Sequence, residues 1–188
     1  MIKLVITCFC GRLVVFRPEP EVDDVAVEAV LTRVCPQCGF DWTLAETVAL
    51  DVVGASPSLY SRAFGGREGA RYGAGGSWSP REYLWHVVDV LRHGTENLWM
   101  LAVDPDAGFA PWREHDLMAA RSASPMSMRV GLWALAVATG EWTRAAYEAP
   151  ADVWAWDRDQ GWSDRSHVLR WTAHEVVHHE QDVRWGLA

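Results

Sequence analysis

The sequence predicts a mainly α-helical protein, a four-helix bundle that carries a small β segment at its N-terminus. Four long stretches between residues 43 and 188 have helical patterns and are joined by loops rich in Gly, Pro and polar residues. Residues 1–42 differ, because they hold all four cysteines and have the pattern of short strands and turns. We therefore divide the chain into a four-cysteine segment, 1–42, and a helical domain, 43–188.

Composition and charge limit the classes of function. The chain has 188 residues, 49% of them hydrophobic, which suffices for one mid-sized domain with a small appendage. Its net charge of -8 argues against nucleic acid as the main partner, because phosphate binding needs a basic face. No apolar run reaches the ~18 residues of a membrane span, and no clear cleavage site follows the apolar N-terminus. We expect a cytoplasmic protein with no nucleic-acid or membrane partner.

The expected elements follow from local signals. Ser79 is the expected N-cap of the second helix, because Pro80 follows it and Glu82 stands at the capping-box distance. The twelve Trp are expected to fill the helical core, the alternative being that some line a ligand pocket. The predicted helices cover about residues 43–64, 79–103, 126–147 and, from Asp164 or Ser166, the C-terminal stretch. The predicted strands lie within 2–8, 12–16 and 26–34, and the predicted loops are 17–24, 65–77, 104–116 and 148–164.

The four cysteines form two close pairs, Cys8 with Cys10 and Cys35 with Cys38. Two pairs separated by a strand-rich stretch resemble a zinc ribbon, in which four thiolates hold Zn²⁺ as a tetrahedron. The glycine after each pair allows a turn that points backbone N–H groups at sulfur. The CPQCG half is the stronger signal, because CFCG has one residue fewer than usual between its cysteines. The expected zinc is structural, and the alternatives are a redox dithiol or unrelated buried cysteines.

A histidine cluster near the C-terminus predicts a second metal site. His174 and His178 are four residues apart, so one helix would direct both imidazoles to one side. His86 is the expected third ligand, because apolar residues surround it in the second helix. Three nitrogens leave a position open for water or substrate, which is typical of a catalytic site for Zn²⁺ or Ni²⁺. The alternative is that these histidines are only hydrogen-bonded, and the weaker candidates for ligands are His93, His115 and His167.

The stretch HEVVH also matches the HExxH motif of zinc proteases, in which the Glu is a general base. Only ten residues follow His178, so no later helix can supply a third ligand. The longer HExxHxxGxxH pattern is absent as well, and we reject the protease interpretation.

Two stretches resemble the DinB-like superfamily, which includes thiol-dependent S-transferases and mycothiol-dependent maleylpyruvate isomerases. WSPREYLWHVVDV (78–90) is similar to the family's second-helix motif with its single metal His, and WTAHEVVHHEQDV (171–183) to its last-helix motif. The resemblance covers about residues 43–188 and leaves the cysteine segment unexplained. It implies an up-down-down-up bundle with a metal in its core. The ligands that it implies are His86, His174 and His178.

A second register of the last helix fits the same family. The isomerase branch uses a Glu and a His four residues apart followed by an Asp, and Glu175, His179 and Asp182 have this spacing. The two faces cannot both point fully inward. We prefer His174 and His178, because the two-histidine form is the commoner pattern.

Three functions remain open. The resemblance favours a metal-dependent transferase or isomerase that acts on a small-molecule substrate with a low-molecular-weight thiol, mycothiol being the expected one. The second is a metal-assisted hydrolase or lyase with Glu175 as the catalytic base. The third is a non-enzymatic metal-binding stress or interaction protein. Bundles of this family often form homodimers, so a homodimer is one expected assembly.

Overall fold

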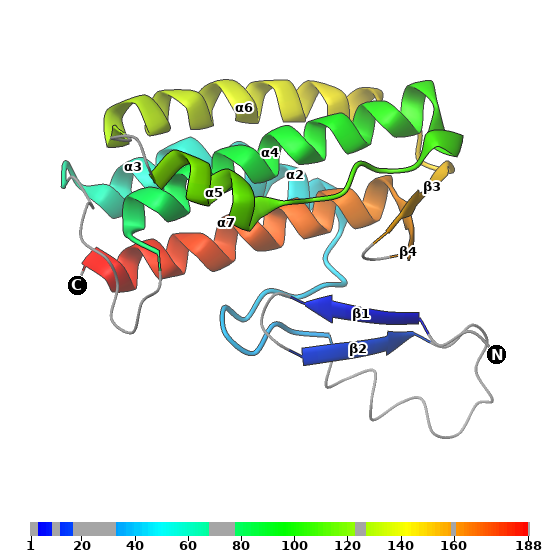
Figure 1. Cartoon of the computed structure of the whole chain (residues 1–188), viewed down its shortest axis with the longest axis horizontal. Coiled ribbons are helices and arrows are strands. Elements are labelled where there is room, and N and C mark those ends of the chain that lie inside the picture. Colours follow the sequence, from blue (N-terminus) through cyan, green and yellow to red (C-terminus); the bar gives the residue numbers. More distant parts are fainter. Residues whose placement is uncertain are drawn as a thin grey trace.

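The computed structural model describes residues 4–8, 12–16, 33–67, 78–122, 127–158 and 161–187 (Figure 1). The helices are α2 (Glu46–Gly54), α3 (Ser56–Phe64), α4 (Pro80–Val103), the 3-10 turn η2 (Pro105–Ala107), α5 (Glu114–Ser122), α6 (Met128–Glu148) and α7 (Arg165–Leu187). The strands are β1 (Leu4–Cys8), β2 (Arg12–Phe16), β3 (Trp154–Asp157) and β4 (Gly161–Asp164). None of the helices within these residues is long and apolar enough to cross a membrane.

Four helical rods form the bundle, and this confirms the predicted fold class. Helix α4 packs against α6 and α7, and the pair α2–α3 packs against the same two helices. Figure 1 shows α2–α3 and α7 running in one direction while α4 and α6 run in the other, which is the up-down-down-up order. Because α4 and α6 are parallel, the chain between them returns along the bundle, and this return contains η2 and α5.

The start of α4 is fixed by the predicted capping box. The Ser79 hydroxyl accepts a hydrogen bond from the backbone N–H of Glu82, and the Glu82 carboxylate accepts one from the backbone N–H of Ser79 at 2.8 Å. This closed pair satisfies two N–H groups that a helix start leaves free. The cap fixes where α4 begins, and His86 follows within this helix.

The first predicted helix is divided in two, which corrects its expected extent of 43–64. Helix α2 ends at Gly54 and α3 begins at Ser56. Pro57 lies at the start of α3, where it lacks an N–H and its ring would clash with the carbonyl of Val53 in a continuous helix. Because of this break, α2 and α3 can take different directions while each packs against α6 and α7.

Two further elements were not predicted: β3 and β4 lie in the predicted loop 148–164, and α5 begins in the predicted loop 104–116 and continues into residues with no predicted element. Helix α5 is held by an ion pair in which Arg121 Nη2 lies 2.6 Å from Asp89 Oδ1 of α4. Strands β3 and β4 pair antiparallel between α6 and α7, with Trp156 opposite Trp162. Both elements are short, and tertiary contacts rather than a long apolar pattern hold them.

The N-terminal segment contains the predicted hairpin of β1 and β2. Its antiparallel register runs from Leu4 opposite Phe16 to Cys8 opposite Arg12. The third predicted strand, 26–34, lies outside the described residues except at its end, where Val34 forms a bridge with Asp41. Cys10 and the side chain of Cys8 also lie outside the described part of the chain.

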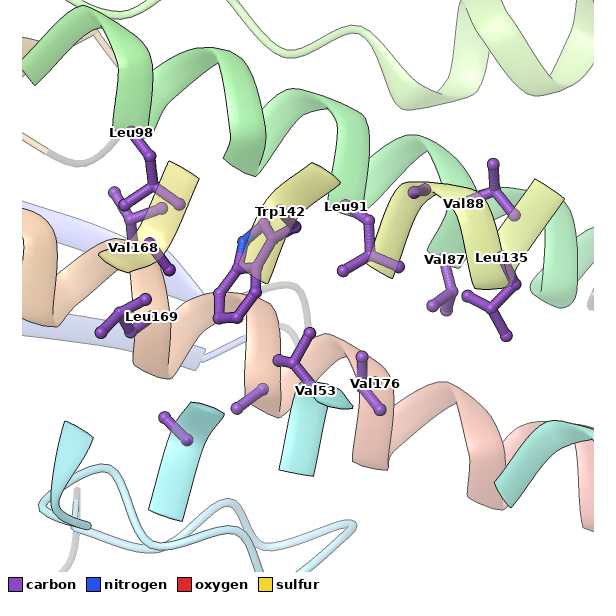
Figure 2. Packing of buried hydrophobic residues seen from close by; sticks show 14 of the residues in the cluster. Val53, Val87, Val88, Leu91, Leu98, Leu135, Trp142, Val168, Leu169 and Val176 are labelled. Carbon is purple, nitrogen blue, oxygen red and sulfur yellow. The ribbon is translucent and has the colours of Figure 1, made fainter. Parts of the chain in front are cut away.

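The core is mainly aliphatic, with a few buried aromatic rings that include Tyr60, Phe64 and Trp142. Trp142 of α6 is fully buried, and Figure 2 shows it in the cluster with Leu91, Val53 and Val176. It is the one fully buried Trp among the described residues, whereas Trp133 of the same helix is 68% exposed. The prediction that the Trp residues fill the core therefore holds for Trp142 and in part for Trp42, Trp85 and Trp99, which are half-buried against the core, but not for exposed ones such as Trp133.

Close packing of α4 on α6 predicts a destabilising effect of Gly94→Ala. A Cβ at Gly94 would lie 2.9 Å from both Thr172 Oγ1 and Trp142 Nε1, and the buried indole has no room to move. We expect the free energy of unfolding to fall by about 1–2 kcal/mol in urea denaturation. Gly140 of α6 is the matched control, because a Cβ there meets nothing within 4 Å. Gly140→Ala should raise stability by about 0.5–1 kcal/mol, and equal effects of the two substitutions would contradict this packing.

Candidate metal centres

Helix α7 carries two potential ligand pairs at adjacent positions. His174 and His178 form one pair and Glu175 and His179 the other, each pair one helical turn apart. Successive residues of a helix are about 100° apart, so the two pairs face different directions. Glu175 and His179 face α4, whereas His174 and His178 face the turn that contains Cys35. Other parts of the chain therefore pack against both faces of α7.

The first cluster, which we call the bundle centre, consists of His86, Glu175 and His179. Glu175 Oε2 lies 3.6 Å from His86 Nε2 and 3.1 Å from His179 Nε2. One ligand atom from each residue lies within 4.8 Å of the others. Two ligands of a tetrahedral Zn²⁺ with bonds of about 2.0–2.1 Å are about 3.3–3.4 Å apart. The spacing of these atoms therefore fits a single ion.

The bundle centre is oriented by a carboxylate behind one of its imidazoles. His179 Nδ1 lies 2.8 Å from Asp182 Oδ2, so it donates to this carboxylate and directs Nε2 toward Glu175. Metal-binding histidines commonly donate their second nitrogen to a carboxylate, which fixes the tautomer and the ring. Asp182 thus has the position of an outer partner of the bundle centre.

Aromatic rings lie against the histidines of this centre. The ring centroid of His86 is 5.0 Å from that of Trp78 and 6.2 Å from that of Trp112. Tyr83 stacks on His179 with centroids 5.2 Å apart. These rings give the ligand set an apolar border, which strengthens electrostatic interactions inside it. Two of the Trp residues therefore border this cluster, outside the hydrophobic core.

Burial and charge set the protonation of the bundle centre. Burial alone would raise the pKa of Glu175, but hydrogen bonds with His174, His179 and His86 hold that pKa well below its ordinary value. Burial lowers the pKa of His86. Burial also opposes a charge on His179, but Asp182 and Glu175 outweigh it and raise the pKa of His179 to about 9. At neutral pH the metal-free centre therefore contains a carboxylate, a neutral His86 and an imidazolium.

This protonation pattern predicts proton release when a metal binds. His179 must lose a proton to become a ligand, so a divalent ion at the bundle centre should displace about one proton at neutral pH. Affinity should rise by roughly tenfold per pH unit and level off as pH passes about 9. Calorimetric metal titrations in buffers with different ionisation enthalpies would measure the release. Cys35 belongs to another potential metal cluster, so the Cys35→Ser variant lets the titration report the bundle centre alone. A pH-independent affinity would contradict the prediction.

The CPQCG turn is a tight hairpin, which we call the knuckle (residues 33–42). The N–H of Cys35 donates to the carbonyl of Phe40 and the N–H of Gly39 to the carbonyl of Cys35, both at 2.8 Å. Gly39 has a φ of 74°, in the left-handed region that a glycine adopts without strain. Burial opposes ionisation of Cys35, but the backbone amide of Cys38, the side chain of His174 and the backbone amide of Gln37 outweigh it and lower the pKa of this thiol to about 7. The turn and His174 together therefore favour a thiolate at Cys35.

The knuckle packs against the other face of α7. Cys35 and Cys38 lie with His174 and His178, and one ligand atom of each is within 4.8 Å of the rest. Cys35 Sγ is 3.8 Å from His178 Nδ1. We call this group the knuckle centre. His178 also lies with His179 and Asp182 in a third group, which overlaps the other two.

The structure divides the predicted three-histidine site between these two clusters. Within the described residues, His86 gathers with Glu175 and His179, while His174 and His178 gather with the knuckle cysteines. The alternative register is therefore the one that faces His86. The predicted four-cysteine set cannot be followed as a whole, because Cys10 and the Cys8 side chain are outside the described residues. The weaker candidates lie outside these clusters, namely His93, His115 and His167.

Comparisons with known proteins show the fold. YfiT from Bacillus subtilis, described as a probable metal-dependent hydrolase with an unusual four-helix bundle topology, superposes with a TM-score of 0.63. The match covers 73% of this chain and 85% of that chain at 14% sequence identity. No family model matches the sequence. No curated protein matches it either.

Proposed function

We propose that this protein is a metal-dependent enzyme whose divalent ion is held by His86, Glu175 and His179. The observation that carries the proposal is the convergence of two imidazoles and one carboxylate from α4 and α7, with spacing that fits one ion. Two histidines and one glutamate form a known catalytic zinc set, in which a fourth position stays open for substrate or water. This ligand set replaces the predicted set of three histidines, and Zn²⁺ is the metal that we propose.

The reaction we favour uses a low-molecular-weight thiol such as mycothiol with a small electrophilic substrate. The support is the Glu-His-Asp spacing of the isomerase branch, which Glu175, His179 and Asp182 reproduce on the face toward α4. When bound, the metal would act as a Lewis acid that lowers the pKa of a coordinated thiol. Glu175 would be a ligand in this arrangement rather than the base expected from the sequence, because its carboxylate contacts three imidazoles.

The other residues of the site orient the ligands and shield them. Asp182 holds the tautomer of His179, and His174 donates through Nδ1 to Glu175 Oε1 at 3.1 Å. Trp78 and Trp112 lie beside His86 and form an apolar border where an electrophile can bind. The chain thus supplies a fixed ligand geometry and a surface of low polarity for the substrate.

Hydrolysis is the second candidate. It is supported by the description of YfiT as a probable metal-dependent hydrolase and by the open position of the ligand set. The two candidates differ in one requirement, since thiol transfer needs a thiol and hydrolysis does not. Trp78 and Trp112 lie beside His86, and the carboxylates near the ligands are already paired, Asp182 with His179 and Asp89 with Arg121. This leaves no free carboxylate among these residues to act as a base, which favours thiol chemistry.

A combined metal and activity assay tests this proposal. Purified protein is stripped with a chelator, reloaded with Zn²⁺, and assayed on a panel of electrophiles with and without mycothiol, and on ester substrates without thiol. We expect His86→Ala to lower the zinc content by about one ion per chain and to lower turnover by at least 10²-fold. His167→Ala is the matched control, because His167 lies on α7 outside the clusters, and it should retain both zinc and turnover.

The outcomes separate the candidates. Thiol-dependent turnover that His86→Ala abolishes would support the favoured reaction, and thiol-independent turnover that His86→Ala abolishes would support hydrolysis. Unchanged zinc content in both His86→Ala and His179→Ala would refute the bundle centre itself.

A further inference from the structure

We infer that Cys35, Cys38, His174 and His178 form a second, structural zinc site that fastens the knuckle to α7. The site differs from the predicted four-cysteine ribbon, because two of its ligands come from the last helix of the bundle. It also differs from the bundle centre, since the two clusters share no ligand.

The spacing of the knuckle centre fits a tetrahedral ion. A Zn²⁺ with a sulfur at ~2.3 Å and a nitrogen at ~2.0–2.1 Å places those two atoms about 3.5 Å apart. Cys35 Sγ and His178 Nδ1 are 3.8 Å apart, and the four ligand atoms lie within 4.8 Å of one another. Cys35 is 2% exposed and His174 is also 2% exposed, so two ligands are already removed from water. Two thiolates and two imidazoles are an established structural zinc set.

An unpartnered nitrogen points to the same ligand. His174 Nδ1 is 3.1 Å from Glu175 Oε1 and donates to it, so Nε2 is the ring nitrogen that remains for a metal ion. Nε2 is buried and has no hydrogen-bond partner among the described residues. A buried polar atom without a partner is costly, and a metal ion would satisfy it. The carboxylate behind His174 also repeats the outer-partner arrangement that Asp182 provides for His179.

The protein surrounds this cluster with packed contacts. Phe40 and Trp42 of the knuckle lie against the His174 ring, with centroids 5.5 and 4.4 Å away. Arg170 Nε of α7 donates to the carbonyl of Leu44 at 2.9 Å, directly beyond the knuckle. Four protein ligands fill a tetrahedral ion, so this site has no open position and would act by holding residues 33–44 on α7.

Ligand-specific variants of the full chain test the inference. With Zn²⁺ supplied, the parent protein should bind about two ions, and the double variant Cys8→Ser/Cys10→Ser should keep both. Cys35→Ser and His178→Ala should each lose about one ion, and His167→Ala should lose none. In Co²⁺-substituted protein the sulfur-to-cobalt charge-transfer band should survive Cys8→Ser/Cys10→Ser and disappear in Cys35→Ser/Cys38→Ser. Loss of zinc from the Cys8→Ser/Cys10→Ser variant, with His178→Ala unaffected, would overturn the site in favour of a four-cysteine ribbon.

A second measurement needs no variant of the knuckle centre. His86→Ala removes the ion of the bundle centre and leaves one zinc for X-ray absorption. We expect a first shell of two sulfur and two nitrogen atoms, and four sulfur atoms would overturn the inference. A Cys35–Cys38 disulfide with no zinc would overturn it as well. The proposed function depends on a different ion, the one that His86 and His179 would hold. If that ion does not bind, the sulfur signal of the knuckle centre should still be present, so the two proposals can fail independently.

Discussion

Glu175→Gln should remove the ion from the bundle centre and weaken the knuckle centre at the same time. The change removes the one carboxylate that lies between His86 and His179, and it replaces the acceptor of His174 Nδ1 by an amide. Loss of an outer partner costs roughly 10- to 100-fold in metal affinity, which we expect for the knuckle centre. At the bundle centre Glu175 is a direct ligand, so its loss should lower the metal affinity by more than this factor. Chelator competition with Zn²⁺ on Cys35→Ser and His86→Ala backgrounds would measure each affinity separately.

The matched control is Glu180→Gln on the same helix. Glu180 lies 2.5 Å from Arg184 Nε in an ion pair within one helical turn, outside the metal clusters. Its removal should leave both affinities unchanged. Parental affinity at both centres in Glu175→Gln would contradict the role that we give to this carboxylate.

Trp142→Ala should cause the largest loss of stability of any single core substitution. Its indole is fully buried where α4 packs on α6, so truncation leaves a cavity that the helices cannot close. Large-to-small changes of this kind cost about 3–5 kcal/mol. In a chain of this length each kcal/mol lowers Tm by about 2–4 °C, so we expect a fall of roughly 6–20 °C. Thermal unfolding followed by circular dichroism, with and without Zn²⁺, would measure it.

Trp133→Ala is the control, because Trp133 lies on the same helix and is 68% exposed. Surface substitutions of this kind change stability by about 0.5 kcal/mol or less. Similar losses from the two substitutions would show that the indole of Trp142 is not the centre of the core.

Much of the fold follows from local sequence signals, because helix ends depend on residues close in the chain. Ser79 and Glu82 predict the start of α4, and both ends of α4 agree with the expected range. The break before Pro57 was missed because proline is also favoured in the first turn of a helix, as at Pro80. Helix α5 was missed because its support is the distant ion pair between Arg121 and Asp89.

The arrangement of the candidate sites could not be predicted from local sequence signals. The sequence reveals both pairs on α7, but a rotation of the helix by about 100° decides which pair faces His86. Packing of Ala173, Val176 and Val183 sets that rotation, and it depends on residues far along the chain. The preference for His174 and His178 assumed that only one face of α7 is covered. The CPQCG motif was recognised as a metal signal, but nothing near it in sequence indicates that its partners lie on α7.

Because Glu175 lies between the two centres, the two proposed ions would load in a linked equilibrium. One of its oxygens accepts from His174, and the other lies between His86 and His179. An ion at the knuckle centre would fix His174 as a neutral donor and would thereby orient the carboxylate that the other proposed ion needs. Linkage requires that each ion change the affinity of the other by the same factor. The order in which the sites fill would then be a property of this single side chain, and a chain deprived of knuckle zinc would also hold its catalytic ion less tightly.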